Sequence, residues 1–103
     1  MELSNGVTEL ENLLIPVYAA FSKDLLYARE TISSYVSDQG FLPLTLPNKM
    51  VHSNPDKIDE NLVRQSNNTL VALANELWVF GPVSDSVRAR IRLAEEQEKP
   101  VRY

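Results

Sequence analysis

Four short apolar segments alternate with three longer amphipathic ones, and this alternation constrains the fold more than any other feature. The short segments are residues 13–21, 41–46, 75–80 and 100–103. Chains that alternate in this way form a parallel sheet with right-handed crossovers and helices on both faces. We therefore predict a three-layer α/β/α fold around a small four-stranded parallel sheet, flavodoxin-like or Rossmann-like, with strand order 2-1-3-4.

The three longer segments have the apolar spacing of helices. We predict a first helix that starts at Ser22 as its N-cap and stops at Gly40, a second over residues 56–74, and a third over residues 85–99. The predicted core face of the second helix is Ile58, Leu62, Val63, Leu70 and Leu73. That of the third helix is Val87, Ile91 and Ala94. The pair Asn67-Asn68 is interpreted as a weak point of the second helix, because asparagine competes for backbone hydrogen bonds.

Length and composition place the chain among ordinary water-soluble domains. Its 103 residues, 44% of them hydrophobic and 23% charged, suit one α/β domain over residues 13–103. We expect residues 1–12 to form an N-terminal extension that frays. No apolar run approaches the length of a membrane span and the start has no signal-peptide pattern, so we expect a cytoplasmic protein that does not bind membranes.

The residue inventory narrows the possible chemistry. The chain has no cysteine and only one histidine, His52, in a polar loop over residues 48–55. Thiolate catalysis and cysteine-based zinc sites are therefore excluded, and we expect no metal and no cofactor. With a net charge of -4, the chain lacks the basic composition that binding to a nucleic acid polymer requires. Any site for an anion must be a local feature.

The fold itself predicts where a ligand would bind. In such sheets ligands lie beyond the carboxyl ends of the strands, where the strand order reverses. With order 2-1-3-4, the turns after the first and third strands face each other there. The candidate ligand-binding residues are Tyr18, Ala20, Phe21, Ser22, Gly81, Ser84, Ser86 and Arg90.

Structural explanations exist for most of these residues. Ser84 or Asp85 would cap the third helix, and hydroxyls and free N–H groups at that helix start would also suit an anion. Arg90 could serve the pocket, the surface or an interface. Tyr18 and Phe21 could stack on a base or simply pack in the core, and Trp78 is interpreted as a packing anchor.

Several short motifs resemble those of one known family. They are Tyr18-Ala19-Ala20-Phe21-Ser22, Gly40-Phe41-Leu42-Pro43-Leu44, Glu76-Leu77-Trp78-Val79-Phe80-Gly81 and Pro100-Val101-Arg102-Tyr103. In order and spacing this set resembles the nucleoside 2-deoxyribosyltransferase-like superfamily, especially a small branch with an "ELWVFG" strand. The resemblance covers about residues 13–103. It implies a nucleoside or nucleotide ligand and cleavage of an N-glycosidic bond by a carboxylate nucleophile.

The chain departs from that family at the positions that carry its chemistry. The family pattern after the third strand is roughly Ser-x-Gly-x-x-x-Glu-Ile-x-x-Ala. Ser84 matches its serine, but Ser86 replaces the glycine, Arg90 replaces the nucleophilic glutamate, and Asn75 replaces an upstream aspartate. Arginine is permanently protonated and cannot stabilise a cationic sugar centre. No catalytic residue can therefore be assigned from the sequence.

We accordingly expect a domain that binds a nucleotide or another phosphorylated small molecule without the family's catalysis. Two alternatives remain open at this stage. The first is an active N-glycosidic hydrolase or transferase that uses a displaced carboxylate. The second is a structural homo-oligomer with a vestigial pocket.

Overall fold

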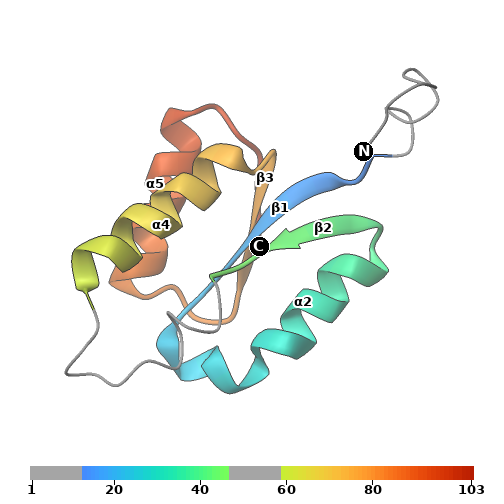
Figure 1. Ribbon diagram of the computed structural model, residues 1–103, viewed down its shortest axis with the longest axis horizontal. Coiled ribbons are helices and arrows are strands. Elements are labelled where there is room, and N and C mark those ends of the chain that lie inside the picture. Colours follow the sequence, from blue (N-terminus) through green and yellow to red (C-terminus); the bar gives the residue numbers. More distant parts are fainter. Residues whose placement is uncertain (1–12, 47–58) are drawn as a thin grey trace.

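One parallel sheet of four strands organises the part of the chain that the structure, a computed structural model, describes: residues 13–46 and 59–103. The sheet has the order β2-β1-β3-β4 (Figure 1). The strands are β1 (Ile15–Phe21), β2 (Phe41–Leu44), β3 (Glu76–Phe80) and β4 (Val101–Arg102). The predicted fold class and strand order are confirmed. Strand β2 ends two residues earlier than predicted.

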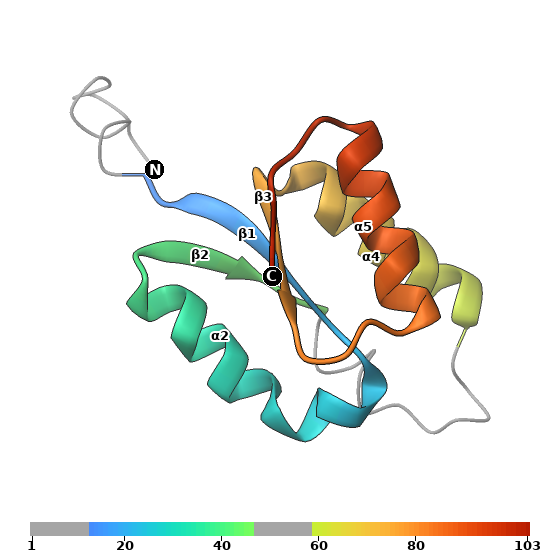
Figure 2. The same ribbon diagram turned by 180° about the vertical axis from the view of Figure 1, so that it is seen from behind.

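Helices cover both faces of this sheet. Helix α2 (Arg29–Asp38) lies on one face, and helices α4 (Glu60–Leu73) and α5 (Asp85–Glu96) lie together on the other (Figures 1 and 2). Among the described residues, no helix is long and apolar enough to cross a membrane. The predicted loop over residues 48–55, which holds His52, lies outside the described residues, as does the predicted extension over residues 1–12.

The first predicted helix is two helices. A 3-10 helix, η1 (Lys23–Ala28), follows β1 and leads into α2. Ser22 occupies the N-cap position, but its hydroxyl makes no capping hydrogen bond. Instead, the Leu25 N–H donates to the Ser22 carbonyl at 3.0 Å, which is the tighter i→i+3 pattern of a 3-10 turn. The Ser22 side chain is consequently not used by the helix that it precedes.

Strand β1 is the centre of the sheet, and its side chains alternate between two cores. Val17 and Ala19 face α2, in a cluster with Ile32, Val36 and Trp78. Tyr18 and Ala20 face the other way. They belong to a cluster with α4 and α5 that includes Val71, Ala74, Leu77, Val79, Val87, Ile91 and Ala94. Trp78 is buried, as its predicted packing role requires.

Pro16 is tolerated in this central strand because of where it lies. It pairs with Leu42 of β2, whereas pairing with β3 begins one residue later, at Val17 opposite Glu76. The Pro16 carbonyl still accepts a hydrogen bond, from the Asn75 N–H at 2.9 Å. The missing proline donor therefore falls at the start of the strand, where such a loss is tolerated.

Two helices end at a residue with a positive φ, and the two residues differ in type. After α2, Gly40 has a φ of +88°, and its N–H bonds the Ser37 carbonyl. After α5, Glu98 takes the left-handed conformation with a φ of 58°. The N–H of Lys99 then bonds the Ala94 carbonyl and that of Glu98 bonds Glu95, which is a Schellman motif. Gly40 thus ends α2 as predicted. After α5 the corresponding residue is Glu98, and a positive φ costs free energy in a residue other than glycine.

The predicted core face of α4 is partly wrong. Leu62 and Leu73 are 47% and 64% exposed, and the buried residues of the helix are Asn67 and Val71. Ile58 lies outside the described residues. The helix is rotated so that Asn67, part of the predicted weak point, faces the core. By contrast, all three predicted core residues of α5 are buried.

Candidate functional site

A small pocket of about 200 Å³ lies where β1 and β2 end, between η1, α4 and α5. Like the predicted site, it lies at the carboxyl end of β1. It is lined from the segment after β2, however, and not from β3 or from residues 81–84 of the turn after β3. The residues that line it are Tyr18, Ala19, Phe21, Ser22, Lys23, Leu26, Arg29, Thr45, Leu46, Asn67, Ser86 and Arg90. We call this the polar pocket, because most of these side chains carry a polar or charged group.

Gly81 brings the turn after β3 against the turn after β1. It has a φ of +73°, and a Cβ at this position would lie 2.3 Å from Cδ1 of Leu25. Only a glycine combines that backbone conformation with so close an approach. Gly81 does not line the polar pocket, but the turn that it permits leads into α5, which carries Ser86 and Arg90.

Two polar atoms of the polar pocket are buried without a hydrogen-bond partner. They are the hydroxyl oxygen of Ser22 and Nε of Arg90. Ser22 as a whole is only 7% exposed. A buried polar group without a partner costs about 1–3 kcal/mol, and more when it is charged. Both atoms therefore have hydrogen-bonding capacity that the folded chain leaves unused.

Arg90 is held in place by its other groups. One terminal nitrogen donates to the Ser86 carbonyl at 2.6 Å, one turn earlier in α5. This bond fixes the side chain along the helix while Nε stays unsatisfied. Arg90 is therefore held by its own helix at the wall of the polar pocket, where it is half-buried.

Tyr18 closes the inner side of the polar pocket. Its hydroxyl donates to Oδ1 of Asn67 at 2.7 Å, in a buried hydrogen bond that joins β1 to α4. Burial raises the pKa of the Tyr18 phenol above 10.0, and the nearby Arg90 guanidinium offsets part of that rise. The phenol is thus a neutral hydrogen-bond donor to Asn67, and its oxygen already interacts with Arg90.

Sequence reasoning missed Asn67 as part of this site. A signal did exist, because a tyrosine inside an apolar strand needs a partner for its hydroxyl when it is buried. The sequence does not say which of many polar side chains supplies that partner. The 49 residues between Tyr18 and Asn67 become neighbours only through the fold.

The charge of the polar pocket is opposite to that of the whole chain. Lys23, Arg29 and Arg90 line it, and none of its described lining residues is an aspartate or glutamate. Arg29 donates to the Leu46 carbonyl at 2.9 Å, which ties η1 and α2 to the segment after β2. In a chain of net charge -4, this is a local concentration of positive charge.

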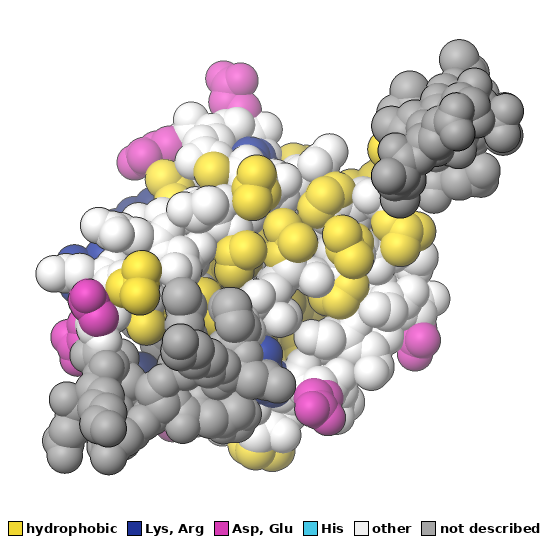
Figure 3. All heavy atoms as spheres, in the orientation of Figure 1, with side chains coloured by type: hydrophobic (Ala, Val, Ile, Leu, Met, Phe, Trp, Pro, Cys, Tyr) yellow, Lys and Arg dark blue, Asp and Glu magenta, His cyan; other side chains and the backbone are white. Residues whose placement is uncertain are grey.

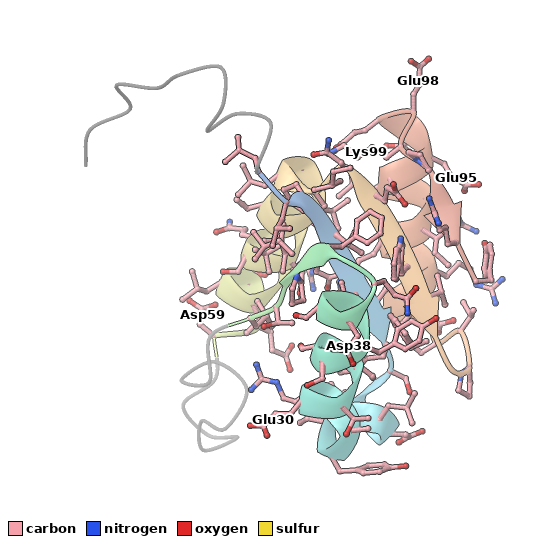
Figure 4. The ribbon with its side chains drawn as sticks, turned by 90° about the vertical axis from the view of Figure 1, so that its right-hand side faces the viewer. Glu30, Asp38, Asp59, Glu95, Glu98 and Lys99 are labelled. Atoms are coloured by element: carbon pink, nitrogen blue, oxygen red, sulfur yellow. The ribbon has the colours of Figure 1, made fainter. Side chains whose placement is uncertain are left out.

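The described carboxylates lie elsewhere. Figure 4 shows Glu30, Asp38 and Asp59 on α2 and at the start of α4, and Glu95 and Glu98 at the far end of α5. Asp59 caps α4 by accepting from the Leu62 N–H at 3.1 Å. Among residues 13–46 and 59–103, no group of three acidic or histidine side chains could hold a metal ion.

The predicted site residues separate into three groups. The structure brings Tyr18, Phe21, Ser22, Ser86 and Arg90 together in the polar pocket. Ala20 is buried in the core on the α4 and α5 face, and Gly81 shapes the turn. Ser84 caps α5, since its hydroxyl accepts from the Val87 N–H at 3.3 Å, and it lies 3.2 Å from the Ser86 hydroxyl.

A larger hollow of about 530 Å³ lies on the α2 side of the sheet. We call it the aromatic groove, because Tyr35, Trp78, Phe80 and Tyr103 line it together with Arg102. Its central polar groups are already paired. Nε1 of Trp78 and Nε of Arg102 both donate to the same oxygen of Glu76, at 3.0 and 2.8 Å. Despite its smaller volume, the polar pocket is the better candidate, because it contains unused hydrogen-bonding groups.

Comparison with models of known protein families and with curated protein sequences finds no match. The chemistry of the polar pocket itself must therefore indicate what it binds. Its features are two buried unpartnered donors, three cationic side chains and a shielded phenol.

Proposed function

We propose that the polar pocket binds the phosphate group of a nucleotide or of another small phosphorylated molecule. The observation that carries this proposal is the pair of buried, unpartnered atoms, the Ser22 hydroxyl and Arg90 Nε, in one cavity. A phosphate oxygen would accept from both donors. Charge-assisted hydrogen bonds of this kind are about twice as strong as those between neutral groups.

The charges around the two donors favour an anion over a neutral ligand. Lys23 and Arg29 add positive charge, and the Ser86 hydroxyl, which shares a hydrogen bond with the Ser84 hydroxyl, lines the same cavity. At about 200 Å³, the cavity is smaller than the roughly 300–1,000 Å³ of a typical drug-sized site. We therefore expect the phosphate and the group next to it to be enclosed, with the rest of the ligand outside.

The resemblance to the nucleoside 2-deoxyribosyltransferase-like superfamily supports a nucleotide as the ligand and argues against retained catalysis. Cleavage of an N-glycosidic bond needs a carboxylate beside the anomeric carbon. Arg90 occupies the position of the family's nucleophile, and no described carboxylate lines the pocket. No observation favours a displaced carboxylate, so we propose binding alone.

Calorimetric titration of the protein with a nucleoside monophosphate, ribose 5-phosphate, inorganic phosphate and the free nucleoside tests this proposal. We expect all three phosphate-containing compounds to bind and the nucleoside to bind at least about tenfold more weakly than its monophosphate, a difference of ~1.4 kcal/mol. Equal affinity for the nucleoside and its monophosphate would contradict a phosphate site.

Two variants of α5 form a matched pair for the same titration. Arg90→Gln removes the charge and the Nε donor, and we expect a loss of about tenfold or more in affinity. Arg88→Gln removes the same charge from an exposed position of the same helix, so we expect at most a twofold change. Equal losses in the two variants would mean that only net charge attracts the ligand.

A further inference from the structure

Leucine side chains are exposed on α4 and on the edge strand β2. Leu62 and Leu73 of α4 and Leu42 of β2 are 47%, 64% and 43% exposed. Leu44 and Leu70 are half-buried beside them and pack against the core below. We call these five leucines the edge patch. Figure 3 shows hydrophobic side chains gathered on this face of the molecule.

The edge patch is exposed because of how the helices cover the sheet. On this face α4 and α5 pack mainly against β1, β3 and β4. Strand β2 is the edge of the sheet, and the side chain of Leu42 points to the same face as that of Leu44. Contiguous apolar patches on soluble proteins usually mark a surface that another chain covers.

The exposed side of α4 has the spacing of a helix that pairs with another helix. Leu62, Ser66, Thr69 and Leu73 follow one another at intervals of four, three and four residues. This spacing places them in one stripe along the helix, like the seam of a two-helix coil. Glu60 and Arg64 fall on the opposite side, so the stripe carries no charge that would repel a partner in a chain of net charge -4.

The sizes of the side chains along the stripe are symmetric about its centre: large, small, small and large. A two-fold axis between Asn67 and Asn68 would place Leu62 of one copy against Leu73 of the second copy, and Ser66 against Thr69. Such self-complementarity is what a two-fold interface requires. The small central residues let two helices approach closely. The Thr69 hydroxyl already donates to the Gln65 carbonyl at 2.9 Å, so burying it leaves no donor unpaired.

We infer that the edge patch is the interface of a homodimer in which the two α4 helices pack antiparallel about a two-fold axis. This interface does not depend on ligand binding. It does lie on the helix whose opposite side carries Asn67, the partner of Tyr18 in the polar pocket.

Sedimentation velocity of the full chain over a range of concentrations tests the inference. We expect the wild type to form a dimer, and Leu62→Glu and Leu73→Lys each to raise its dissociation constant at least about tenfold. Both substitutions favour α4 itself, because an acid lies near its N-terminus and a base near its C-terminus. Circular dichroism should therefore show a folded monomer.

The double variant Leu62→Glu/Leu73→Lys tests the antiparallel arrangement. Within one chain these residues are about 16 Å apart along the helix, but across the two-fold axis each glutamate would face a lysine. We expect the double variant to dimerise at least about tenfold more tightly than either single variant. Tyr103→Glu, which places the same charge in the aromatic groove, should leave the dimer unchanged.

Three results would overturn the inference. A monomeric wild type at all concentrations would mean that no second copy covers the edge patch. If Tyr103→Glu made the dimer dissociate while Leu62→Glu stayed dimeric, the interface would lie at the aromatic groove and not at the edge patch. A double variant as weak as the single ones would exclude the antiparallel pairing of α4.

Discussion

Helices α4 and α5 lie on the same face of the sheet, and both have an apolar side and a side-chain N-cap, yet they use their apolar residues differently. In α5 the predicted residues Val87, Ile91 and Ala94 are all buried. In α4 the predicted Leu62 and Leu73 are exposed. The same kind of sequence pattern therefore identifies a core in one helix and a surface in the other.

The difference follows from what each helix covers. Helix α5 lies over β1, β3 and β4, so its whole apolar stripe meets the sheet. Helix α4 lies against β1 on one side only, and its buried side includes Asn67 because the Tyr18 hydroxyl needs an acceptor there. Leu62 and Leu73 lie on another side of α4 and stay exposed. Periodicity reveals that a helix has an apolar side, but the neighbouring elements decide which part of that side is buried.

Truncating one apolar side chain on each helix should give the largest contrast. Ile91→Ala empties a buried position of α5 and should cost about 2–5 kcal/mol in unfolding free energy. Leu73→Ala removes a side chain that is 64% exposed and should cost less than about 1 kcal/mol. Urea unfolding in dilute solution, where association is least, measures both. Equal losses would show that Leu73 is buried within the monomer.

The hydrogen bond between Tyr18 and Asn67 of α4 should make the next largest contribution to the unfolding free energy. Asn67→Ala leaves the buried Tyr18 hydroxyl without its acceptor and should cost about 1–3 kcal/mol. In a Tyr18→Phe background the same change should cost clearly less, because the phenol is already gone. Asn68→Ala, an exposed neighbour, is the matched control and should cost nothing. Purely additive losses would mean that the hydrogen bond contributes no coupling.

The carboxyl end of α4 depends on the turn that follows α5. Nζ of Lys99 donates to the carbonyls of Val71, Ala72 and Ala74, at 2.8, 2.5 and 2.6 Å. Lys99→Met keeps the apolar stem but removes these bonds, and we expect a loss of ~1 kcal/mol because the group is partly exposed. Thermal unfolding measures it, with Arg92→Met at an exposed position of α5 as control. An unchanged melting temperature would contradict the role of Lys99 as a cap.

The smallest expected effect is a dependence on pH. The folded state raises the pKa of Tyr18, so it holds the phenol proton more tightly than the unfolded chain does. The unfolding free energy should therefore be insensitive to this group below about pH 10 and fall as the pH rises above it. Comparing wild type with Tyr18→Phe from about pH 8 to about pH 11 isolates the contribution of Tyr18. Tyr27→Phe, at an exposed tyrosine, is the control and should leave the difference between wild type and Tyr18→Phe unchanged.

The fold could be predicted from the sequence because its signals are local. Alternating apolar and amphipathic segments predicted a parallel sheet between helices, and Gly40 predicted the end of α2. Ser22 and Arg90 were also recognised as site candidates, since they follow the strands whose ends meet. Asn67 could not be recognised, because its role depends on a contact with Tyr18 across the fold. The exposure of Leu62 and Leu73 depends in the same way on the width of the sheet beneath α4.

The contact between Gly81 and Leu25 couples the changes that these two positions can accept. Every single substitution of Gly81 adds at least a Cβ, which would lie 2.3 Å from the Leu25 side chain at a φ of +73°. Such a substitution forces Leu25, which is half-buried, into another rotamer, and it carries ~1–2 kcal/mol of backbone cost. The turns after β1 and β3, which flank the polar pocket, should therefore diverge as a coupled pair, because a smaller residue at position 25 lowers the cost of a change at position 81.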